Sequence, residues 1–200
     1  MKKFDCLQCG KCCHEYEFAG EASVKRIPVF PEELGRLEDY ARENNIKIKF
    51  IEDVVFPDRI NSKILVITYK IILEGETRVC PFFNVNVGCL VNEIKPLACK
   101  AYPLAQKKID AFNESIEIDP YCEFVSRFED KIKKMESIDL KEFFHCEFLQ
   151  SQRLMRKNQD IILKIRELTF QGKLDIPDKI NTEEFDKYLK TWERVYLDDL

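Results

Sequence analysis

The cysteines at the front of the chain are the feature that most restricts what this sequence can fold into. The segment "CLQCGKCCHEY" places four thiols within residues 6–13, in a chain of 200 residues that has nine cysteines. Four more follow at wide spacing, at Cys80, Cys89, Cys99 and Cys122. Burial of small apolar side chains gives no reason for such clustering, so the thiols indicate metal binding, redox chemistry or cross-links.

Composition and location decide between these uses of cysteine. The first residues include lysines but no apolar run, and no stretch approaches the roughly 18 apolar residues of a membrane span, so we expect a cytoplasmic protein. Cytosolic thiols are normally reduced, which favours metal binding. The many Ile, Lys and Glu residues are typical of hyperthermophile proteins, where a disulfide framework is an alternative. The net charge of -4 gives no reason to expect nucleic acid or an anionic membrane as a partner.

The spacing of the thiols distinguishes between soft metal centres. Cys6, Cys9 and Cys12 repeat the Cys-x2-Cys-x2-Cys spacing that wraps one side of an iron–sulfur cluster, whose fourth thiol is often a distant cysteine before proline. Cys80 precedes Pro81 and is such a candidate. A zinc ribbon would use a second Cys-x2-Cys pair, which this chain lacks. The spacing therefore favours an iron–sulfur cluster, of the [4Fe–4S] type, while zinc stays open.

The doubled cysteine, Cys12 and Cys13, adds a second inference. Adjacent side chains point to opposite sides of an extended chain and lie about 100° apart on a helix, so we do not expect both to ligate one compact ion. Cys13 then serves a second site with some of Cys89, Cys99 and Cys122, or it is a spare thiol for redox chemistry. Cys99 is also the other candidate for the distal ligand of the first centre.

Charged and titratable neighbours complete the predicted site. Lys11, Lys95 and Lys100 lie close in sequence to the thiols and would favour the thiolate that binds metal. We expect His14 to be a solvated loop histidine rather than a fifth ligand, and Cys146 to be a small buried side chain on a helix. The predicted metal ligands are Cys6, Cys9, Cys12, Cys13, Cys80, Cys89, Cys99 and Cys122.

Hydrophobic patterning predicts an α+β fold. "FPEELGRLEDYAREN" predicts a short amphipathic helix from Pro31 to about Asn44. Residues 63–83 predict a hairpin that turns at 74–76 and runs into Cys80, and residues 106–119 predict a second hairpin that turns near Asn113. The stretch between the two hairpins is expected to be irregular, because its two prolines limit helix and its glycine suggests a turn.

The last third of the chain is predicted to be helical. From about residue 124 the apolar residues follow a helical stripe, as in one long helix or two packed helices. Asn181 is a candidate N-cap for a final helix with Glu184 three residues on, and its apolar stripe is predicted to extend through Trp192 to Tyr196. We expect a single domain, residues 1–200, in which a small antiparallel sheet of hairpins and irregular cysteine-rich loops (1–122) packs against C-terminal helices (123–200).

The chain also resembles a known family. "CLQCGKCC", followed by "VCPFFNVNVGCLVNEIKPLACKAYPL", is similar to the Cys-x2-Cys-x2-Cys-Cys family of YkgJ-type cysteine cluster proteins over roughly residues 4–122. Lys95 and Lys100 stand where that family usually has arginine, and Gly88 and Cys89 are adjacent. The basic character of these positions is kept.

The resemblance implies binding of zinc or iron by the clustered cysteines. The relatives include flagellin lysine methylases, so a protein-lysine methyltransferase-like or thiol-redox enzyme, acting on a protein substrate or redox partner, is one alternative. A zinc-stabilised interaction module is another. No glycine-rich phosphate loop and no Cys-x3-Cys-x2-Cys spacing is present, and two histidines leave little for a histidine-centred site.

Overall fold

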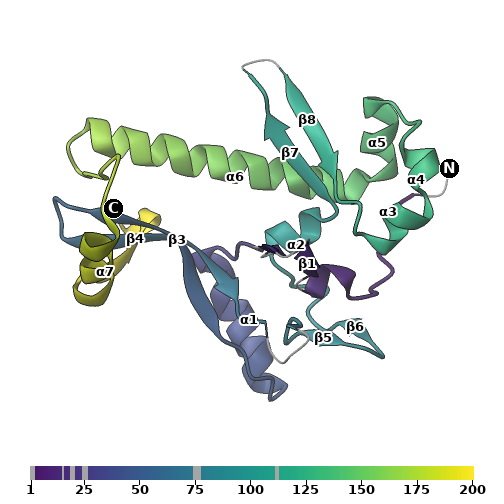
Figure 1. Ribbon diagram of the computed structural model, residues 1–200, viewed down its shortest axis with the longest axis horizontal. Helices are drawn as coiled ribbons and strands as arrows, with labels where there is room; N and C mark the ends of the chain where they lie inside the picture. The colour runs from purple at the N-terminus through teal and green to yellow at the C-terminus, as the bar shows by residue number, and fades with distance from the viewer. Residues whose placement is uncertain (1–2, 15, 19–20, 24–26, 74–77, 111–112) are drawn as a thin grey trace.

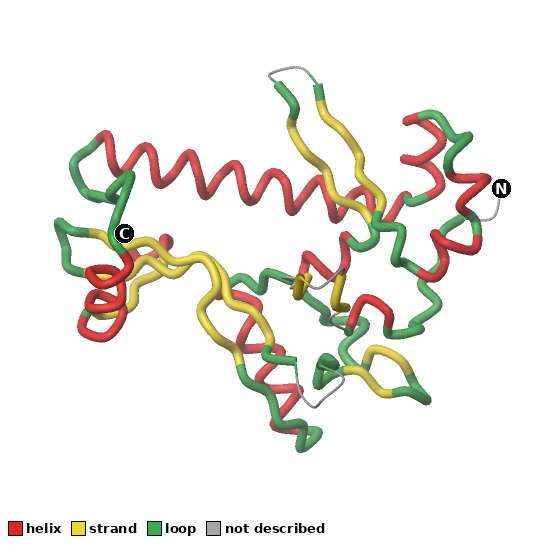
Figure 2. The backbone as a smooth tube through the Cα atoms, viewed as in Figure 1, coloured by secondary structure: helices red, strands yellow, loops and turns green. Residues whose placement is uncertain are grey.

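The protein has the expected α+β fold, with short sheets and helices arranged around a loop-rich centre (Figures 1 and 2). The computed structural model describes residues 3–14, 16–18, 21–23, 27–73, 78–110 and 113–200. The long helix α6 (His145–Phe170) runs along one side of the molecule. The central sheet lies toward one end of α6, and the short helices α3 to α5 lie at the other end.

The central sheet has three strands in the order β3, β4, β9: Phe50–Asp58, Lys63–Ile71 and Glu193–Tyr196. β3 and β4 are antiparallel, with irregular register around Val54, whereas β9 pairs parallel to β4 with Leu65 opposite Val195. β4 has a partner on each side and is buried from Ile64 to Thr68. Successive residues of a strand point to opposite faces, so burial of five in a row means that both faces of β4 are covered. This explains why its sequence is a continuous apolar run rather than an alternating one.

The predicted hairpin that turns at residues 74–76 is wrong, because β4 does not pair with the segment that runs into Cys80. β4 pairs with β3 and β9, and the turn expected at 74–76 lies outside the described residues. Val79, just before Cys80, instead forms an isolated bridge with His14 at the front of the chain. The prediction failed because β3 contains Glu52, Asp53 and a proline, which hid it as a strand, and sheet pairing depends on contacts that spacing alone does not show.

The other predicted local elements are largely confirmed. Helix α1 (Pro31–Glu43) begins at the expected proline, and the second hairpin is β7 (Leu104–Lys108) with β8 (Glu114–Ile118). Helix α2 (Leu97–Ala101) was not predicted, because it has only five residues and lies between two prolines. The remaining short strands pair as two antiparallel ribbons: β1 (Tyr16–Phe18) with β2 (Glu21–Ser23), and β5 (Phe83–Asn84) with β6 (Gly88–Cys89).

The C-terminal part is helical, but it is broken into more pieces than predicted. Its helices are α3 (Glu123–Arg127), α4 (Glu129–Ile132), α5 (Ser137–Phe143), α6 and α7 (Thr182–Thr191), with a last 3₁₀ turn at Leu197–Asp199. The predicted cap is confirmed, since the Asn181 side chain accepts a hydrogen bond from the Glu184 N–H at 2.8 Å. The stripe to Tyr196 is wrong, because the helix ends at Thr191 and Tyr196 lies on β9.

Three groups of buried residues hold these elements together. The first lies where the front of the chain meets β7 and α3 to α5, and it includes Phe124 and Phe144. The second joins α1 to the sheet through Leu37, and the third joins the end of α6 to β4 and β9 through Leu168 and Val195. Of the helices described, none is both long enough and apolar enough to cross a membrane.

Candidate metal centre

The front loop begins from a fixed point on the helical part. The Phe4 N–H donates to the Phe143 carbonyl at 2.8 Å, and the Phe4 ring packs 4.9 Å from that of Phe124 and 5.1 Å from that of Phe144. These contacts belong to the first buried group, so residues 6–13 leave a packed surface. The loop therefore carries its four thiols over a defined path.

A glycine-dependent turn then directs the doubled cysteine. Gly10 has φ 78°, and a Cβ added there would lie 2.2 Å from the Phe83 ring, so only glycine fits. The chain continues into a 3₁₀ turn, Lys11–Cys13. Phe83 lies on β5, so this contact sets the front turn directly against the β5–β6 ribbon.

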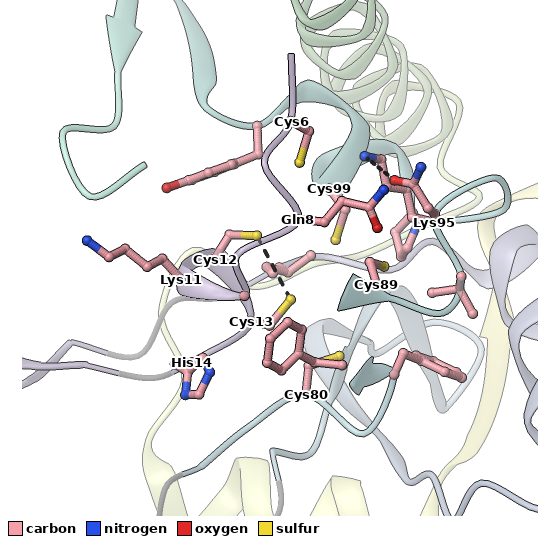
Figure 3. Close-up of a pocket in the computed structure, with 18 of the residues that line it drawn as sticks. Cys6, Gln8, Lys11, Cys12, Cys13, His14, Cys80, Cys89, Lys95 and Cys99 are labelled. Atoms are coloured by element: carbon pink, nitrogen blue, oxygen red, sulfur yellow. Dashed lines mark hydrogen bonds between the residues drawn. The ribbon is translucent and has the colours of Figure 1, made fainter. Parts of the chain in front are cut away.

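The sulfurs of Cys12 and Cys13 lie close together, whereas the sequence predicted that these side chains point apart. They lie 3.9 Å apart and face the same space (Figure 3). Adjacent Cα atoms are about 3.8 Å apart, so suitable side-chain rotamers bring the two sulfurs together even when the Cα–Cβ bonds point apart. Two thiolates on one tetrahedral zinc, each about 2.3 Å from the metal, would be about 3.8 Å apart. The geometric argument against a shared ion is therefore overturned.

Backbone pairing joins the front loop to the cysteines that follow. The Cys80 N–H donates to the Cys13 carbonyl at 2.8 Å, beside the bridge between His14 and Val79. Cys89 lies on β6, paired with Phe83. These contacts bring thiols far apart in the sequence to the same place, which spacing alone could not establish.

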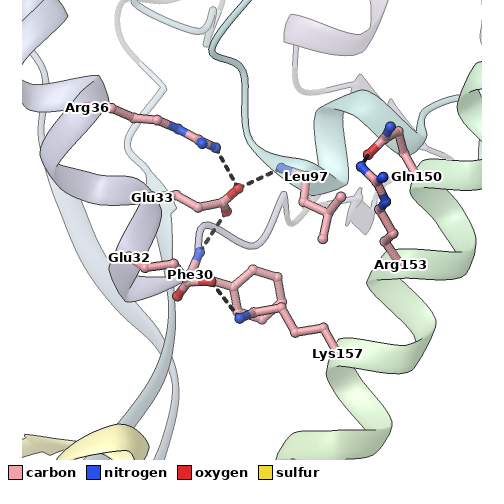
Figure 4. Close-up of polar contacts among 8 residues, drawn as sticks. All are labelled: Phe30, Glu32, Glu33, Arg36, Leu97, Gln150, Arg153 and Lys157. Atoms are coloured by element: carbon pink, nitrogen blue, oxygen red, sulfur yellow. Dashed lines mark hydrogen bonds and ion pairs between the residues drawn. The ribbon is translucent and has the colours of Figure 1, made fainter.

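Cys99 is positioned by a buried carboxylate that the sequence did not reveal (Figure 4). Glu33 on α1 is 5% exposed, and it accepts hydrogen bonds from the N–H groups of Phe30 at 3.0 Å and Leu97 at 2.8 Å. Leu97 begins α2, the helix that carries Cys99. In the sequence Glu33 is only an acidic residue in a first helical turn, so its tertiary role left no signal.

All eight predicted cysteines line one cavity of about 320 Å³. Figure 3 shows the sulfurs of Cys12, Cys13, Cys80, Cys89 and Cys99 gathered around this space, with Cys6 beside them. Most of the cavity wall is apolar, and its phenylalanines come from the front loop, the β5–β6 region and α3. The structure thus assembles thiols from five separate chain segments, namely the front loop and the segments at Cys80, Cys89, Cys99 and Cys122.

The positions of Cys146 and His14 differ from those expected. Cys146 is exposed in the first turn of α6 and is not among the described lining residues, so its expected burial is wrong. Within α6 only Ser151 and Leu168 are buried, and both lie beyond that first turn. His14 lines the cavity and is partly buried, with its ring edge-on to Phe83 at 5.6 Å.

Hydrogen bonds and burial act on the thiols in different directions. The pKa of Cys80 is lowered, chiefly because its sulfur is hydrogen-bonded to Cys13, and the Phe82 N–H adds to this. The pKa of Cys13 is raised, because its thiol is hydrogen-bonded to Cys12 and Cys80 and is also buried. The pKa of Cys99 is raised well above its ordinary value, mainly by burial. Metal binding at this site must therefore displace protons.

Backbone N–H groups already point at several sulfurs. Burial raises the pKa of Cys89 and Cys122, but an N–H group of Val91 opposes this at Cys89, and those of Val125 and Phe124 oppose it at Cys122. Hydrogen bonds of this kind to thiolate sulfurs tune metal–thiolate centres. The donors therefore fit a site built to hold thiolates.

The thiols fall into two electrostatic neighbourhoods. Apart from burial and the N–H groups, the pKa of Cys122 is raised by the nearby thiols of Cys6 and Cys9. Among the thiols, Cys12 has the largest effect on the pKa of Cys99. Within the described parts of the chain, no three His, Cys, Asp or Glu side chains converge on one point as a ready-made ligand set. The cavity gathers the donors without closing them around a single ion.

The predicted lysines differ in their relation to the cavity. Lys11 lines it and forms an ion pair with Glu123, the residue after Cys122. Lys95 lines it and donates to the Asn92 side-chain oxygen at 3.1 Å. Lys100 is not among the described lining residues.

The fold and the cavity define an α+β protein with a pocket of clustered thiols, the donor type that binds zinc and iron–sulfur centres. The chain belongs to the CxxCxxCC family, described as "Putative zinc- or iron-chelating domain", whose family model matches residues 5–123. The resemblance seen in the sequence is thereby confirmed. No curated protein matches the chain, and no solved structure matches it.

Proposed function

We propose that this protein binds an iron–sulfur cluster, with the [4Fe–4S] type favoured, through the thiols of its cavity, and that zinc is the alternative metal. The observation that carries the proposal is the convergence of eight cysteines on one cavity. Four thiolates ligate such a cluster or a zinc ion. A bound cluster would supply electron transfer, and either centre would supply a structural cross-link. The family description supports chelation of one of these two metals.

The size of the cavity favours a cluster over one closed zinc site. Its volume of about 320 Å³ is far larger than the roughly 10–15 Å³ that a cavity needs to hold one water molecule. A single ion held by four sulfurs leaves no such space, whereas a polynuclear cluster or two centres would use it. The Cys-x2-Cys-x2-Cys spacing points the same way.

The ligand set that we propose begins with Cys6, Cys9 and Cys12. The distal ligand is Cys80 or Cys99, and the remaining thiols form a second centre or support the first. The shared cavity supports this set, because all five of these cysteines line it. Cys13, which contacts Cys12 and Cys80, and Cys122, which lies near Cys6 and Cys9, are placed beside the proposed ligands.

We also propose that residues 1–200 act as one domain in the cytoplasm. Helix α6 packs on α2, and β9 pairs with β4, so the C-terminal part contributes to the framework that carries the thiols. A reducing compartment keeps thiols available for metal, and all nine cysteines are present as thiols.

Purification without oxygen tests the metal. We expect iron and acid-labile sulfide in equal amounts, with a broad visible absorption that bleaches on reduction. The Cys12→Ser variant should lose most of the metal, and Cys146→Ser, whose thiol is exposed and outside the cavity, should keep it. A colourless protein with neither iron nor zinc, unchanged after reconstitution, would refute the proposal.

One observation favours a second function, that of a thiol-redox protein. The thiol of Cys13 is hydrogen-bonded to both Cys12 and Cys80, so two of these three thiols could be oxidised to a disulfide while a partner disulfide is reduced to two thiols. Mass spectrometry of protein treated with a small oxidised dithiol tests this. Absence of any bond between these three cysteines would remove the candidate.

A further inference from the structure

Lys95 differs from Lys11 and Lys70, two other cations that line the cavity. It lies on the wall just before α2, beside Cys89 and Cys99 (Figure 3). Its hydrogen-bond partner is the neutral side-chain amide of Asn92, at 3.1 Å. The ammonium group is thus held in place without being neutralised by that contact.

Two of the neighbouring cations are paired with carboxylates. Lys11 forms an ion pair with Glu123, and Lys70 lies 3.9 Å from the carboxylate of Asp53. Lys95 has no ion pair with any carboxylate in the described part of the chain. Lys95 therefore brings a less compensated positive charge to the thiols.

Lys95 lies beside two thiols that line the same cavity wall, those of Cys89 and Cys99. It opposes the rise in the pKa of both Cys89 and Cys99 that burial causes. The carboxyl of Glu147, which also lines the cavity, is the competing group, and burial raises its pKa too. A centre ligated by thiolates carries negative charge, and a positive charge in a partly buried site is screened less than at the surface.

We propose that Lys95, held by Asn92, sets the charge balance of the metal centre and stabilises its more negative state. This inference rests on the proposed function. For an iron–sulfur cluster, the state favoured is the one that has gained a single electron from the reductant, with no bond formed or broken. For zinc, it is the thiolate-bound ion itself.

Three variants of the metal-loaded protein test the proposal. Lys95→Gln removes the charge, Lys95→Arg keeps it, and Lys100→Gln removes a charge of the same sign from α2, outside the described cavity wall. The cluster is titrated with dithionite and followed by its visible absorption. If the metal is zinc, its affinity is measured by competition with a chromophoric chelator.

We expect Lys95→Gln to shift the equilibrium on the order of tenfold toward the oxidised cluster, or to weaken zinc binding by a similar factor. Lys95→Arg should restore the wild-type value, and Lys100→Gln should leave it nearly unchanged. A merely structural role would lower metal content or stability without moving the equilibrium of the loaded protein.

An unchanged equilibrium in Lys95→Gln, at normal metal content, would overturn the role of Lys95. An equal shift in Lys100→Gln would overturn it as well. Failure of the wild-type protein to bind metal would instead overturn the proposed function, so the two failures are distinguishable.

Discussion

Replacement of Glu33 by alanine should be among the most damaging single changes outside the cysteines. Its carboxylate joins two elements far apart in the sequence, by accepting the N–H groups of Phe30 at 3.0 Å and Leu97 at 2.8 Å. It also receives the Arg36 guanidinium at 2.8 Å. Because Glu33 is 5% exposed, water cannot easily replace these contacts.

The magnitude follows from the groups left without a partner. A buried N–H that loses its acceptor costs about 1–3 kcal/mol, so two of them give about 2–6 kcal/mol for Glu33→Ala. In a chain of this size each kcal/mol lowers Tm by about 2–4 °C. Glu33→Gln keeps one acceptor oxygen and should lose about half as much free energy of unfolding.

Urea unfolding followed by circular dichroism measures this loss. Glu32→Gln is the matched control, because Glu32 lies next in the sequence, is exposed, and forms an ion pair with Lys157 that should contribute no more than about 1 kcal/mol. If Glu33→Ala destabilises the protein no more than Glu32→Gln does, the assigned role of Glu33 in anchoring α2 is refuted.

The structure makes three further predictions. Gly10→Ala should destabilise the protein by about 2–5 kcal/mol, because alanine would strain the left-handed backbone and collide with Phe83. Gly35→Ala, on α1 with open space around it, should instead stabilise the protein by about 0.5–1 kcal/mol. Calorimetry measures both changes, and equal effects of the two variants would contradict the reasoning. Asn181→Ala should cost about 1 kcal/mol in thermal unfolding, because α7 loses its cap, and no loss would mean that the cap is not stabilising. The metal-free protein should lose stability above about pH 9. Burial raises the folded-state pKa of Cys99 above the ordinary value of 9.0, so the thiol loses its proton first in the unfolded chain, and rising pH favours unfolding. A urea midpoint that rises at high pH would contradict this direction of the pH dependence.

Local patterns predicted the elements whose stability is itself local. Helix α1 and the β7–β8 hairpin were recognised because a proline at the first helical turn and an apolar alternation around a turn residue act within a few residues. The Asn181 cap was recognised for the same reason, since its acceptor and donor are three residues apart.

Pairing across the chain was not predictable in the same way. The partner of β4 was predicted wrongly, and Tyr196 was assigned to a helix although it lies on β9 opposite Val66. Both errors have one cause. A strand is stabilised by the neighbour beside it, and that neighbour can lie anywhere in the sequence.

The candidate site divides along the same line. The sequence by itself determined that eight thiols are available and that four of them follow the Cys-x2-Cys-x2-Cys-Cys pattern, because the identity and spacing of donors are covalent properties. Only the tertiary structure decided that they share one cavity, that the sulfurs of Cys12 and Cys13 converge to 3.9 Å, and that Cys146 is exposed and outside it. The placement of Lys95 and Glu33 also depends on it, since contacts between separate elements follow from packing and backbone hydrogen bonds that no local pattern encodes.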